Sequence, residues 1–223
     1  MSRLGNTFPW SVTDVPLQNR VDPFGQICVS EARGMFTGNR GIIHDPDTRT
    51  LLKRRWSTKA WIICVCAFGG RRRKVMGRNG RNGSAGWTEL FFLDEVTALA
   101  AGHRPCFYCQ RERATAFREH FAAASTAPQM DDILHRERRA SGGKPVPLSP
   151  DEVLQLPNGA MVEVNRAVFA ALDGRFVPWN FHGYGTEVAD FAVDGTVQLV
   201  TPASTVAALA NGYQPIWHDS ARA

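Results

Sequence analysis

Two thiols stand three residues apart in the segment Ala98–Cys109, which reads A-L-A-A-G-H-R-P-C-F-Y-C. A tight turn after Pro105 would direct the sulfurs of Cys106 and Cys109 to one point, as a tetrahedral zinc site with Zn–S distances of about 2.3 Å requires. A Cys-x-x-Cys pair can also be a redox couple, usually at the start of a helix in a βαβ unit, or two buried free thiols. Because this pair follows the expected end of a helix, we predict that it binds a metal, with the other two interpretations as alternatives.

The remaining ligands of such a site have to come from few candidates. Cys64 and Cys66 lie in the apolar, β-branched run W-I-I-C-V-C-A-F at 61–68, which predicts a strand. Alternation along a strand places both thiols on one face, with Cα atoms about 7 Å apart. We therefore predict Cys64 and Cys66 as further ligands, against the alternative of two buried core thiols. His44, beside Asp45 in a polar turn, is the alternative ligand.

Asp132 and His135 are the candidates for acid–base catalysis. The segment 130–139, M-D-D-I-L-H-R-E-R-R, predicts a short helix in which both side chains share a face at i and i+3. A carboxylate that orients an imidazole can support proton transfer. The alternative is a surface salt bridge, which such pairs form more often.

The formal net charge of +5 is unevenly distributed along the chain. Between Thr48 and Thr88 there are eleven Lys or Arg residues and no Asp or Glu, with Trp56, Trp61 and Trp87 among them. Concentrated positive charge with aromatic side chains suits phosphate contact and base stacking, and the alternative is a solvated basic face. We predict a nucleic-acid-binding surface, and the residues proposed for it are Arg71, Arg72, Arg73, Lys74, Arg78, Arg81 and Arg104.

Helix and turn signals predict how the first part of the chain positions these residues. Asp94 can cap a helix over 95–101, and Gly102 can take the left-handed position that ends it. A second helix is expected over 110–124, with Phe117 and Phe121 in its apolar stripe. Strands are expected at 51–55, 61–68 and 89–93, and at 71–76 as the return of a hairpin that turns at 69–70.

The last part of the chain has the period of short strands. Asn-Gly and Asp-Gly turns separate segments expected to be strands at 160–164, 168–172, 175–179 and 196–200. A final helix follows, for which Thr201 is the expected cap and Pro202 the first helical residue.

Together these patterns predict an α+β fold. It would consist of a small antiparallel β-sheet with helices around a zinc site, followed by a small β-rich C-terminal subdomain. The expected division is an N-terminal arm at 1–40, a zinc-binding basic α+β domain at 41–140, a linker at 141–156, and a β-rich subdomain at 157–223 that ends in a helix.

Length and composition set further bounds. A chain of 223 residues with 43% hydrophobic side chains can bury a sizeable core. No apolar run approaches the roughly 18 residues that span a membrane, and the N-terminus lacks the apolar core of a secretory signal. Five cysteines, an odd number, argue against a disulfide framework. We therefore expect a cytoplasmic protein without a membrane partner.

The segment Phe91–Cys109, F-F-L-D-E-V-T-A-L-A-A-G-H-R-P-C-F-Y-C, resembles the second half of the zinc-binding N-terminal domain of the Ada DNA-repair methyltransferase family. In that family a strand and a helix ending in A-L-A-A-G-[FY]-R-P-C-x-x-C supply two of four zinc thiolates. The resemblance covers under a tenth of the chain and implies zinc ligation by Cys106 and Cys109. The segment 33–45, R-G-M-F-T-G-N-R-G-I-I-H-D, is similar to bacterial proteins and implies no activity.

This sequence departs from the Ada pattern upstream. The family's other two thiolates come from a Cys-x-x-x-Cys pair, one of them the methyl acceptor that repairs alkylated phosphates. That spacing is absent here, so the methyl-acceptor role has no matching position.

These observations favour a zinc-containing protein that binds nucleic acid, DNA rather than RNA, in DNA repair or in the recognition of modified DNA. The first alternative is a nucleic-acid-processing enzyme, such as a nuclease or a glycosylase. The second is a metal or redox sensor without a nucleic-acid partner, for which the basic segment would be incidental.

Overall fold

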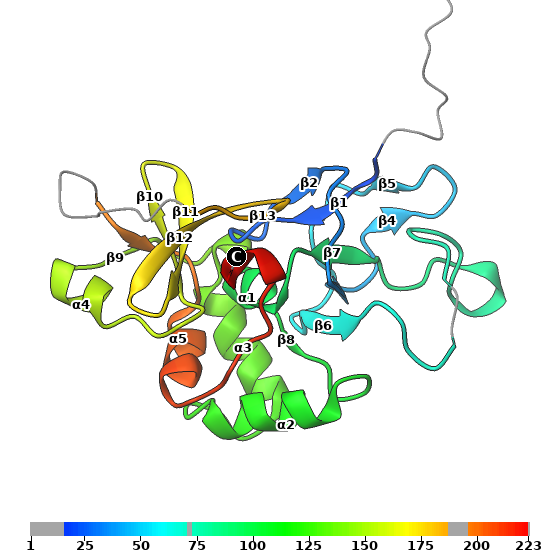
Figure 1. Cartoon of the computed structure of the whole chain (residues 1–223). Coiled ribbons are helices and arrows are strands. Elements are labelled where there is room, and N and C mark those ends of the chain that lie inside the picture. Colours follow the sequence, from blue (N-terminus) through cyan, green and yellow to red (C-terminus); the bar gives the residue numbers. More distant parts are fainter. Residues whose placement is uncertain (1–15, 71–72, 187–195, 223) are drawn as a thin grey trace, which may run out of the picture.

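The protein, seen here as a computed structural model that describes residues 16–70, 73–186 and 196–222, has the expected α+β architecture (Figure 1). Its first sheet has six strands, in the order β2 (Ile27–Val29), β1 (Gln18–Val21), β7 (Leu90–Phe92), β3 (Phe36–Asn39), β6 (Ile62–Val65) and β8 (Arg104–Pro105). Neighbouring strands are antiparallel except for two pairs, β1 with β7 and β6 with β8. The sheet is therefore mixed rather than purely antiparallel.

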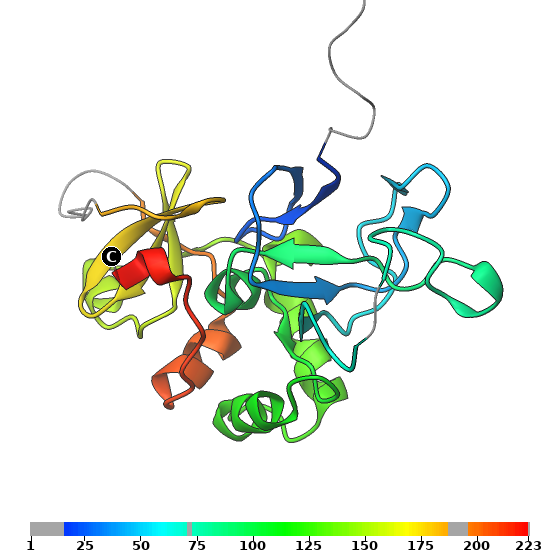
Figure 2. The same ribbon diagram turned by 45° about the vertical axis from the view of Figure 1, so that its right-hand side comes forward.

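The two faces of this sheet differ in character. Side chains alternate along a strand, so Phe36, Ile63, Leu90 and Phe92 all point to one side and join the largest apolar cluster. Helices cover that side, as two views 45° apart show (Figures 1 and 2). The intervening residues of the same strands point to the opposite side, which carries the site described below.

The described helices that pack on the sheet are α1 (Glu95–Ala100), α2 (Arg111–His120), α3 (Ala127–Glu137) and α5 (Ala203–Ala210). α1 begins at Asp94, whose carboxylate accepts a hydrogen bond from the backbone N–H of Thr97 at 2.8 Å, and Gly102 follows its end with a φ of 77°. Both sequence expectations for this helix are confirmed. No helix in the described ranges is long and apolar enough to cross a membrane.

The second sheet lies on the other side of α1. Its order is β13 (Gly183–Tyr184), β12 (Arg175–Asn180), β11 (Ala167–Leu172), β10 (Met161–Val164), β14 (Gln198–Leu199) and β9 (Val146–Pro147), with α4 (Pro150–Leu154) beside it. Leu93, Val96 and Ala100 pack from α1 and its N-terminal side into this sheet's core. The C-terminal part also enters the first core, because Ala208 and Leu209 of α5 pack there.

Two buried carboxylates at the start of α1 hold the end of the chain. Asp94 accepts hydrogen bonds from the Tyr184 hydroxyl at 2.9 Å and from the backbone N–H of His218 at 3.0 Å. Glu95 accepts from the Tyr213 hydroxyl at 2.6 Å, from the backbone N–H of Ile216 at 2.8 Å, and from the guanidinium of Arg113 on α2. These bonds tie α1, α2 and the last segment into one body.

Three local expectations differ from the structure. Residues 16–40, the described part of the expected arm, form β1, β2 and β3 and are therefore an integral part of the first sheet. Residues 73–76 form no strand with β6, whose partners are β3 and β8, and 71–72 lie outside the described residues. Pro202 occupies the N-cap position of α5, because the Thr201 hydroxyl instead accepts the backbone N–H of Met161 at 2.8 Å.

Substitution of Glu95 should destabilise the whole protein. Glu95→Gln keeps the shape of the side chain but removes the charge that Arg113 faces and one of the acceptors used by Tyr213 and Ile216. We expect a loss of about 2–4 kcal/mol in the free energy of unfolding, measured by urea denaturation. Glu112→Gln, on the exposed side of α2, is the control and should stay within about 0.5 kcal/mol of wild type. Equal stability of the two variants would contradict this role for Glu95.

Candidate metal centre

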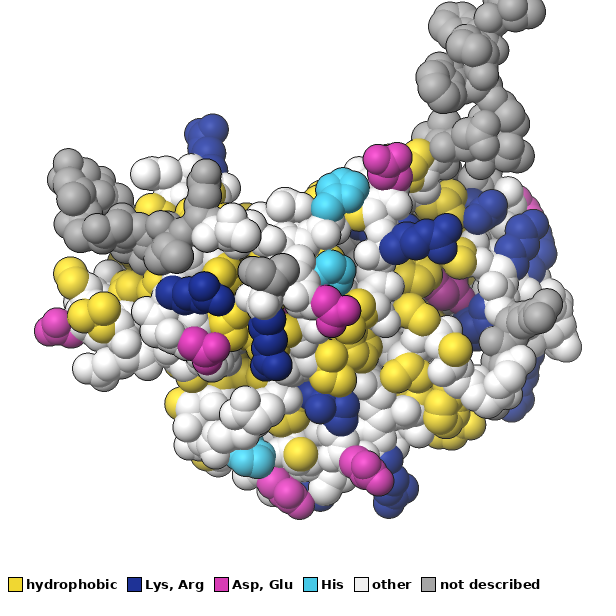
Figure 3. Space-filling view, in the orientation of Figure 1, with side chains coloured by type: hydrophobic (Ala, Val, Ile, Leu, Met, Phe, Trp, Pro, Cys, Tyr) yellow, Lys and Arg dark blue, Asp and Glu magenta, His cyan; other side chains and the backbone are white. Residues whose placement is uncertain are grey.

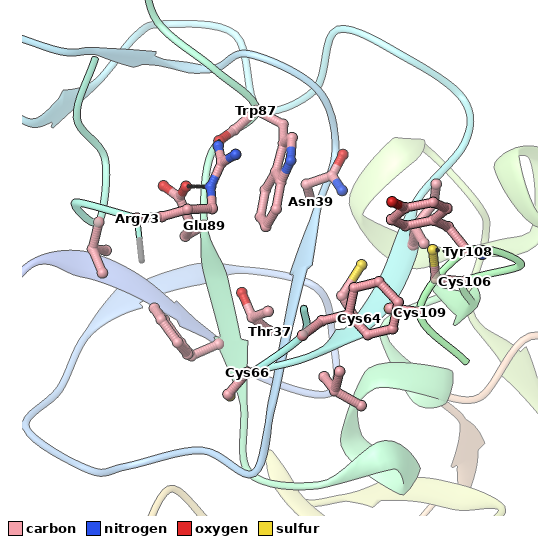
Figure 4. A pocket seen from close by; sticks show the side chains of 15 residues that line it. Thr37, Asn39, Cys64, Cys66, Arg73, Trp87, Glu89, Cys106, Tyr108 and Cys109 are labelled. Carbon is pink, nitrogen blue, oxygen red and sulfur yellow. Dashed lines mark hydrogen bonds and ion pairs between the residues drawn. The ribbon is translucent and has the colours of Figure 1, made fainter. Parts of the chain in front are cut away.

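The structure brings three of the four proposed cysteine ligands together. Cys64 on β6 and Cys106 and Cys109 in the loop between β8 and α2 have sulfur atoms that all lie within 4.8 Å of one another. A tetrahedral zinc with Zn–S bonds of about 2.3 Å holds its sulfurs about 3.8 Å apart, so a small contraction would suffice. The cluster can therefore hold a metal ion, and its sulfurs face one side of a cavity (Figure 4).

Backbone pairing between β6 and β8 positions the loop that carries Cys106 and Cys109. The N–H groups of Arg104 and Cys106 donate to the carbonyls of Trp61 and Ile63 at 3.1 and 3.0 Å. Gln110, the residue before α2, adds a bond from its side-chain amide to the same Ile63 carbonyl at 3.0 Å. The loop is thus fixed against the strand that carries Cys64.

A buried arginine reinforces the same junction. Arg138 donates to the carbonyl of Gly102, just before β8, at 3.0 Å and to the carbonyl of Lys59, just before β6, at 2.9 Å. Its guanidinium lies 3.7 Å from the ring centroid of Trp61, and that of Arg40 lies 3.8 Å from it. Two guanidiniums therefore flank the indole at the base of β6.

The hydrogen bonds within the cluster give its three thiols different pKa values. The thiol of Cys64 donates to Cys106, and the backbone N–H groups of Cys109 and Tyr108 also point at that sulfur, so the pKa of Cys106 falls to about 5. The same bond to Cys106, together with burial, raises the pKa of Cys64, and burial raises the pKa of Cys109. One thiolate thus lies among two thiols at neutral pH, and metal binding would replace the two remaining protons.

Cys66 and His44 lie outside the cluster. β6 ends at Val65, so strand alternation stops before Cys66, whose exposed thiol donates to the carbonyl of Met35 at 3.4 Å. His44 is buried and bonds the Thr88 hydroxyl at 2.7 Å and the Gly77 carbonyl at 3.3 Å. The prediction of Cys66 and His44 as ligands is therefore not supported by their positions among the described residues.

The cavity beside the cysteines occupies the uncovered face of the first sheet. It has a volume of about 290 Å³. Its floor consists of alternate residues of the three central strands, and these are Thr37 and Asn39 on β3, Ile62 and Cys64 on β6, and Phe91 on β7. The strand order therefore places the cysteine cluster at one edge of a hollow that extends across the sheet.

A charged and aromatic wall faces the cysteines across this cavity. Arg73 donates to Glu89 at 2.6 Å, and its guanidinium lies 4.2 Å from the ring centroid of Trp87 (Figure 4). Glu89 also accepts from the backbone N–H of Met76 at 2.8 Å and from the side-chain amide of Asn79 at 3.2 Å. Glu89 thereby fixes the segment that carries Arg73, and its oxygens are already engaged.

Asp132 and His135 do not pair with each other. Asp132 accepts from Lys59 at 2.8 Å on an exposed part of α3, and the pKa of its carboxyl is lowered chiefly by that bond. His135 instead contacts Arg138 at 3.0 Å and lies edge-on to Trp56. Neither lines the cavity, so the proposed catalytic pair is corrected to two separate surface contacts.

The proposed nucleic-acid contacts have different surroundings. Arg104 is buried and makes two 2.8 Å bonds to Asp131, so it is unavailable to a ligand. Arg78 is exposed but paired with Asp47, which lies just outside the acid-free segment. Arg73 lines the cavity, Lys74 and Arg81 are exposed, and Arg71 and Arg72 lie outside the described residues.

Sequence reasoning missed the polar floor of the cavity. Thr37 and Asn39 lie on β3, in a stretch expected to be part of an arm. The alternation of Phe36 and Gly38 with Thr37 and Asn39 is the signal that could have indicated a strand with one apolar and one polar face.

Comparisons with protein-family models, curated proteins and solved structures gave no match. The resemblance of residues 91–109 to the Ada zinc domain accordingly stays a prediction.

Removal of one cluster cysteine should abolish metal binding, whereas removal of Cys66 should not. We expect zinc near one equivalent in wild type and Cys66→Ser, and strong depletion in Cys106→Ser, because two remaining thiolates hold zinc poorly. Elemental analysis after purification in zinc-supplemented medium measures this. Full zinc content in Cys106→Ser would contradict the assignment.

The metal-free protein should show one unusually acidic thiol. With a pKa of about 5, Cys106 is already a thiolate at neutral pH, so its alkylation rate should change little between about pH 6.5 and 8.5. Partial desolvation raises the pKa of Cys66 above its usual 9.0, so its alkylation rate should rise about tenfold per pH unit. Mass spectrometry of iodoacetamide-treated, chelator-washed protein distinguishes the two, and equal pH dependence would contradict the prediction.

Proposed function

We propose that this protein binds zinc through Cys64, Cys106 and Cys109 and binds nucleic acid over the basic surface beside the metal. The observation that carries the proposal is that the cysteine cluster shares one cavity with Arg73 and Trp87 of the basic segment. Thiolate ligands suit zinc, which favours tetrahedral sites with sulfur donors. The five free cysteines fit a reducing compartment such as the cytosol.

Positive charge of the basic segment that has no acidic partner supports a polyanionic ligand. Among the described residues, Lys53, Arg54, Arg55, Lys74 and Arg81 are exposed and form no ion pair with an acidic group. Lys and Arg side chains gather on the right-hand part of the surface in Figure 3, near β1, β4 (His44–Asp45) and β5 (Thr50–Leu51). Such a surface attracts phosphates and releases counterions on binding. The Ada resemblance favours DNA as the nucleic acid.

A bound zinc ion would stabilise the fold by cross-linking the segments that carry its cysteine ligands. It would connect β6 to the β8–α2 loop, and binding free energy in such sites contributes directly to folding. Among the described residues no fourth His, Cys, Asp or Glu joins the cluster. A fourth position on the cavity side would then be available to water or to a group of the ligand.

That available position favours a nucleic-acid-processing enzyme as the second candidate. Catalytic zinc sites combine three protein ligands with one exchangeable position, whereas structural sites usually have four. Turnover of an oligonucleotide by the zinc-loaded protein, absent from Cys64→Ser, would support this candidate. Absence of turnover under conditions in which the oligonucleotide is bound would favour the binding protein.

The affinity for nucleic acid should depend steeply on salt concentration and on exposed Lys and Arg side chains of the basic segment. We expect the affinity for DNA to fall at least about tenfold between about 50 and 200 mM salt, and the double variant Lys74→Glu/Arg81→Glu to bind about tenfold more weakly. The double variant Arg166→Glu/Arg175→Glu, on exposed residues just before β11 and at the start of β12, changes the net charge equally and is the matched control, which should bind like wild type. Fluorescence anisotropy with a labelled oligonucleotide measures both effects.

Affinity that does not change with salt would contradict a phosphate-binding surface. An equal loss in Arg166→Glu/Arg175→Glu would indicate an effect of net charge rather than a local contact.

A further inference from the structure

A second hollow adjoins the cavity beside the cysteine cluster, which we call the metal-side cavity, on the same face of the first sheet. It has a volume of about 620 Å³ and is lined by residues of β1, of the segment after β2, and by Arg49. The two hollows share Cys66, Val75 and Phe91. They therefore adjoin along these three residues, and we call the two together the sheet groove, with the cysteine cluster at one end.

The end of the sheet groove away from the cysteines carries concentrated positive charge. Arg20, Arg33 and Arg49 line it together with one acid, Glu31. Within the described chain, none of these arginines forms an ion pair with an acidic group. Burial, followed by the nearby charge of Arg33, lowers the pKa of Arg20, in keeping with positive charges that lack a counter-ion.

Backbone and ring contacts fix two of these arginines in place. Arg20 donates to the carbonyl of Ala32, and its guanidinium lies 5.0 Å from the ring centroid of Phe91. Arg49 donates from Nε to the carbonyl of Val75 at 3.2 Å. Both guanidiniums are positioned before a ligand arrives, which lowers the entropic cost of binding an anion.

The metal-side half of the groove instead offers flat apolar surfaces. The indole of Trp87 lies between Arg73 and Asn39 (Figure 4). Across the cavity, the rings of Phe68 and Tyr108 lie 5.3 Å apart and are 42% and 67% exposed. Its volume of about 290 Å³ is close to the lower end of the roughly 300–1,000 Å³ of small-molecule sites, so it suits one small planar group.

We infer that the sheet groove binds single-stranded nucleic acid, with an unstacked base against Trp87 beside the metal centre and the adjoining phosphates at Arg20, Arg33 and Arg49. Bases in a duplex are stacked and cannot enter a recess of this size, whereas single strands present their faces to aromatic side chains on a sheet. The inference rests on the proposed function and adds the class of nucleic acid and its placement.

The test compares a labelled single strand of about 12 nucleotides, within the range of about 4–16 nucleotides known for single modules, with the corresponding duplex. We expect the zinc-loaded protein to bind the single strand at least about tenfold more tightly. Trp87→Ala should weaken single-strand binding by about 5- to 100-fold, and Trp87→Phe should restore most of it. Phe181→Ala, an aromatic residue between β12 and β13 of the second sheet and outside both hollows, is the control and should bind like wild type.

The arginine end is tested by salt dependence. Arg33→Ala should lower the slope of log K against log salt by about 0.7, the value for one phosphate contact with a single strand. Arg136→Ala, exposed on α3, should leave the slope unchanged. Zinc content and circular dichroism verify that each variant is folded.

Equal affinity for single strand and duplex, or an unchanged affinity in Trp87→Ala, would overturn this inference, while salt-dependent binding would leave the proposed function intact. Absence of binding to either nucleic acid would overturn both.

Discussion

The short parallel pairing of β6 with β8 is the contact on which the cysteine cluster depends. β8 has two residues, yet it connects the strand that carries Cys64 to the loop that carries Cys106 and Cys109. The pairing is supported by Gln110 from the helix side and by Arg138, which bonds the carbonyls just before both strands. A two-residue strand would be weak by itself, so these side-chain bonds are what keep the three sulfurs close.

The first sheet divides its chemistry between two faces. Helices bury the face that carries Phe36, Ile63, Leu90 and Phe92, and this burial supplies the stability of the domain. The other face is free to bear polar, charged and aromatic groups, because it contributes little to that core. Neighbouring residues of these strands of three and four residues point to opposite faces of the sheet. One residue therefore packs in the core while the next is available to a ligand.

The sequence was most informative where local chemistry decides the structure. The cap at Asp94, the left-handed Gly102 and the closeness of Cys106 to Cys109 follow from neighbours in the chain. It was less informative for β1, β2 and β3, which are short and pair with distant strands through contacts that no local pattern encodes. Cys66 lies outside the cluster because β6 ends at Val65, three residues before the end of the apolar run that predicted the strand.

The sequence also could not show which basic side chains have an acidic partner in the folded protein. The segment 48–88 contains no acid, yet Asp47, Glu89 and Asp132 fold back onto Arg78, Arg73 and Lys59. Arg104 belonged to the same expected surface but is buried against Asp131. Arg20 on β1 and Arg33 in the segment after β2 both lie outside residues 48–88, yet they line a hollow on the uncovered face of the sheet.

The order in which the three clustered cysteines occur along the chain has a consequence for biosynthesis. Cys64 leaves the ribosome well before Cys106 and Cys109, and the bonds that hold α1 and α2 await Tyr213 and Ile216 near the end of the chain. Until residues 104–109 have been made, the β6 edge that β8 will cover is open, and Cys64 lacks both cysteines of its cluster. A metal ion held by all three cysteines would therefore be acquired late in maturation, and a growing chain that is held up on the ribosome would be open to oxidation at Cys64.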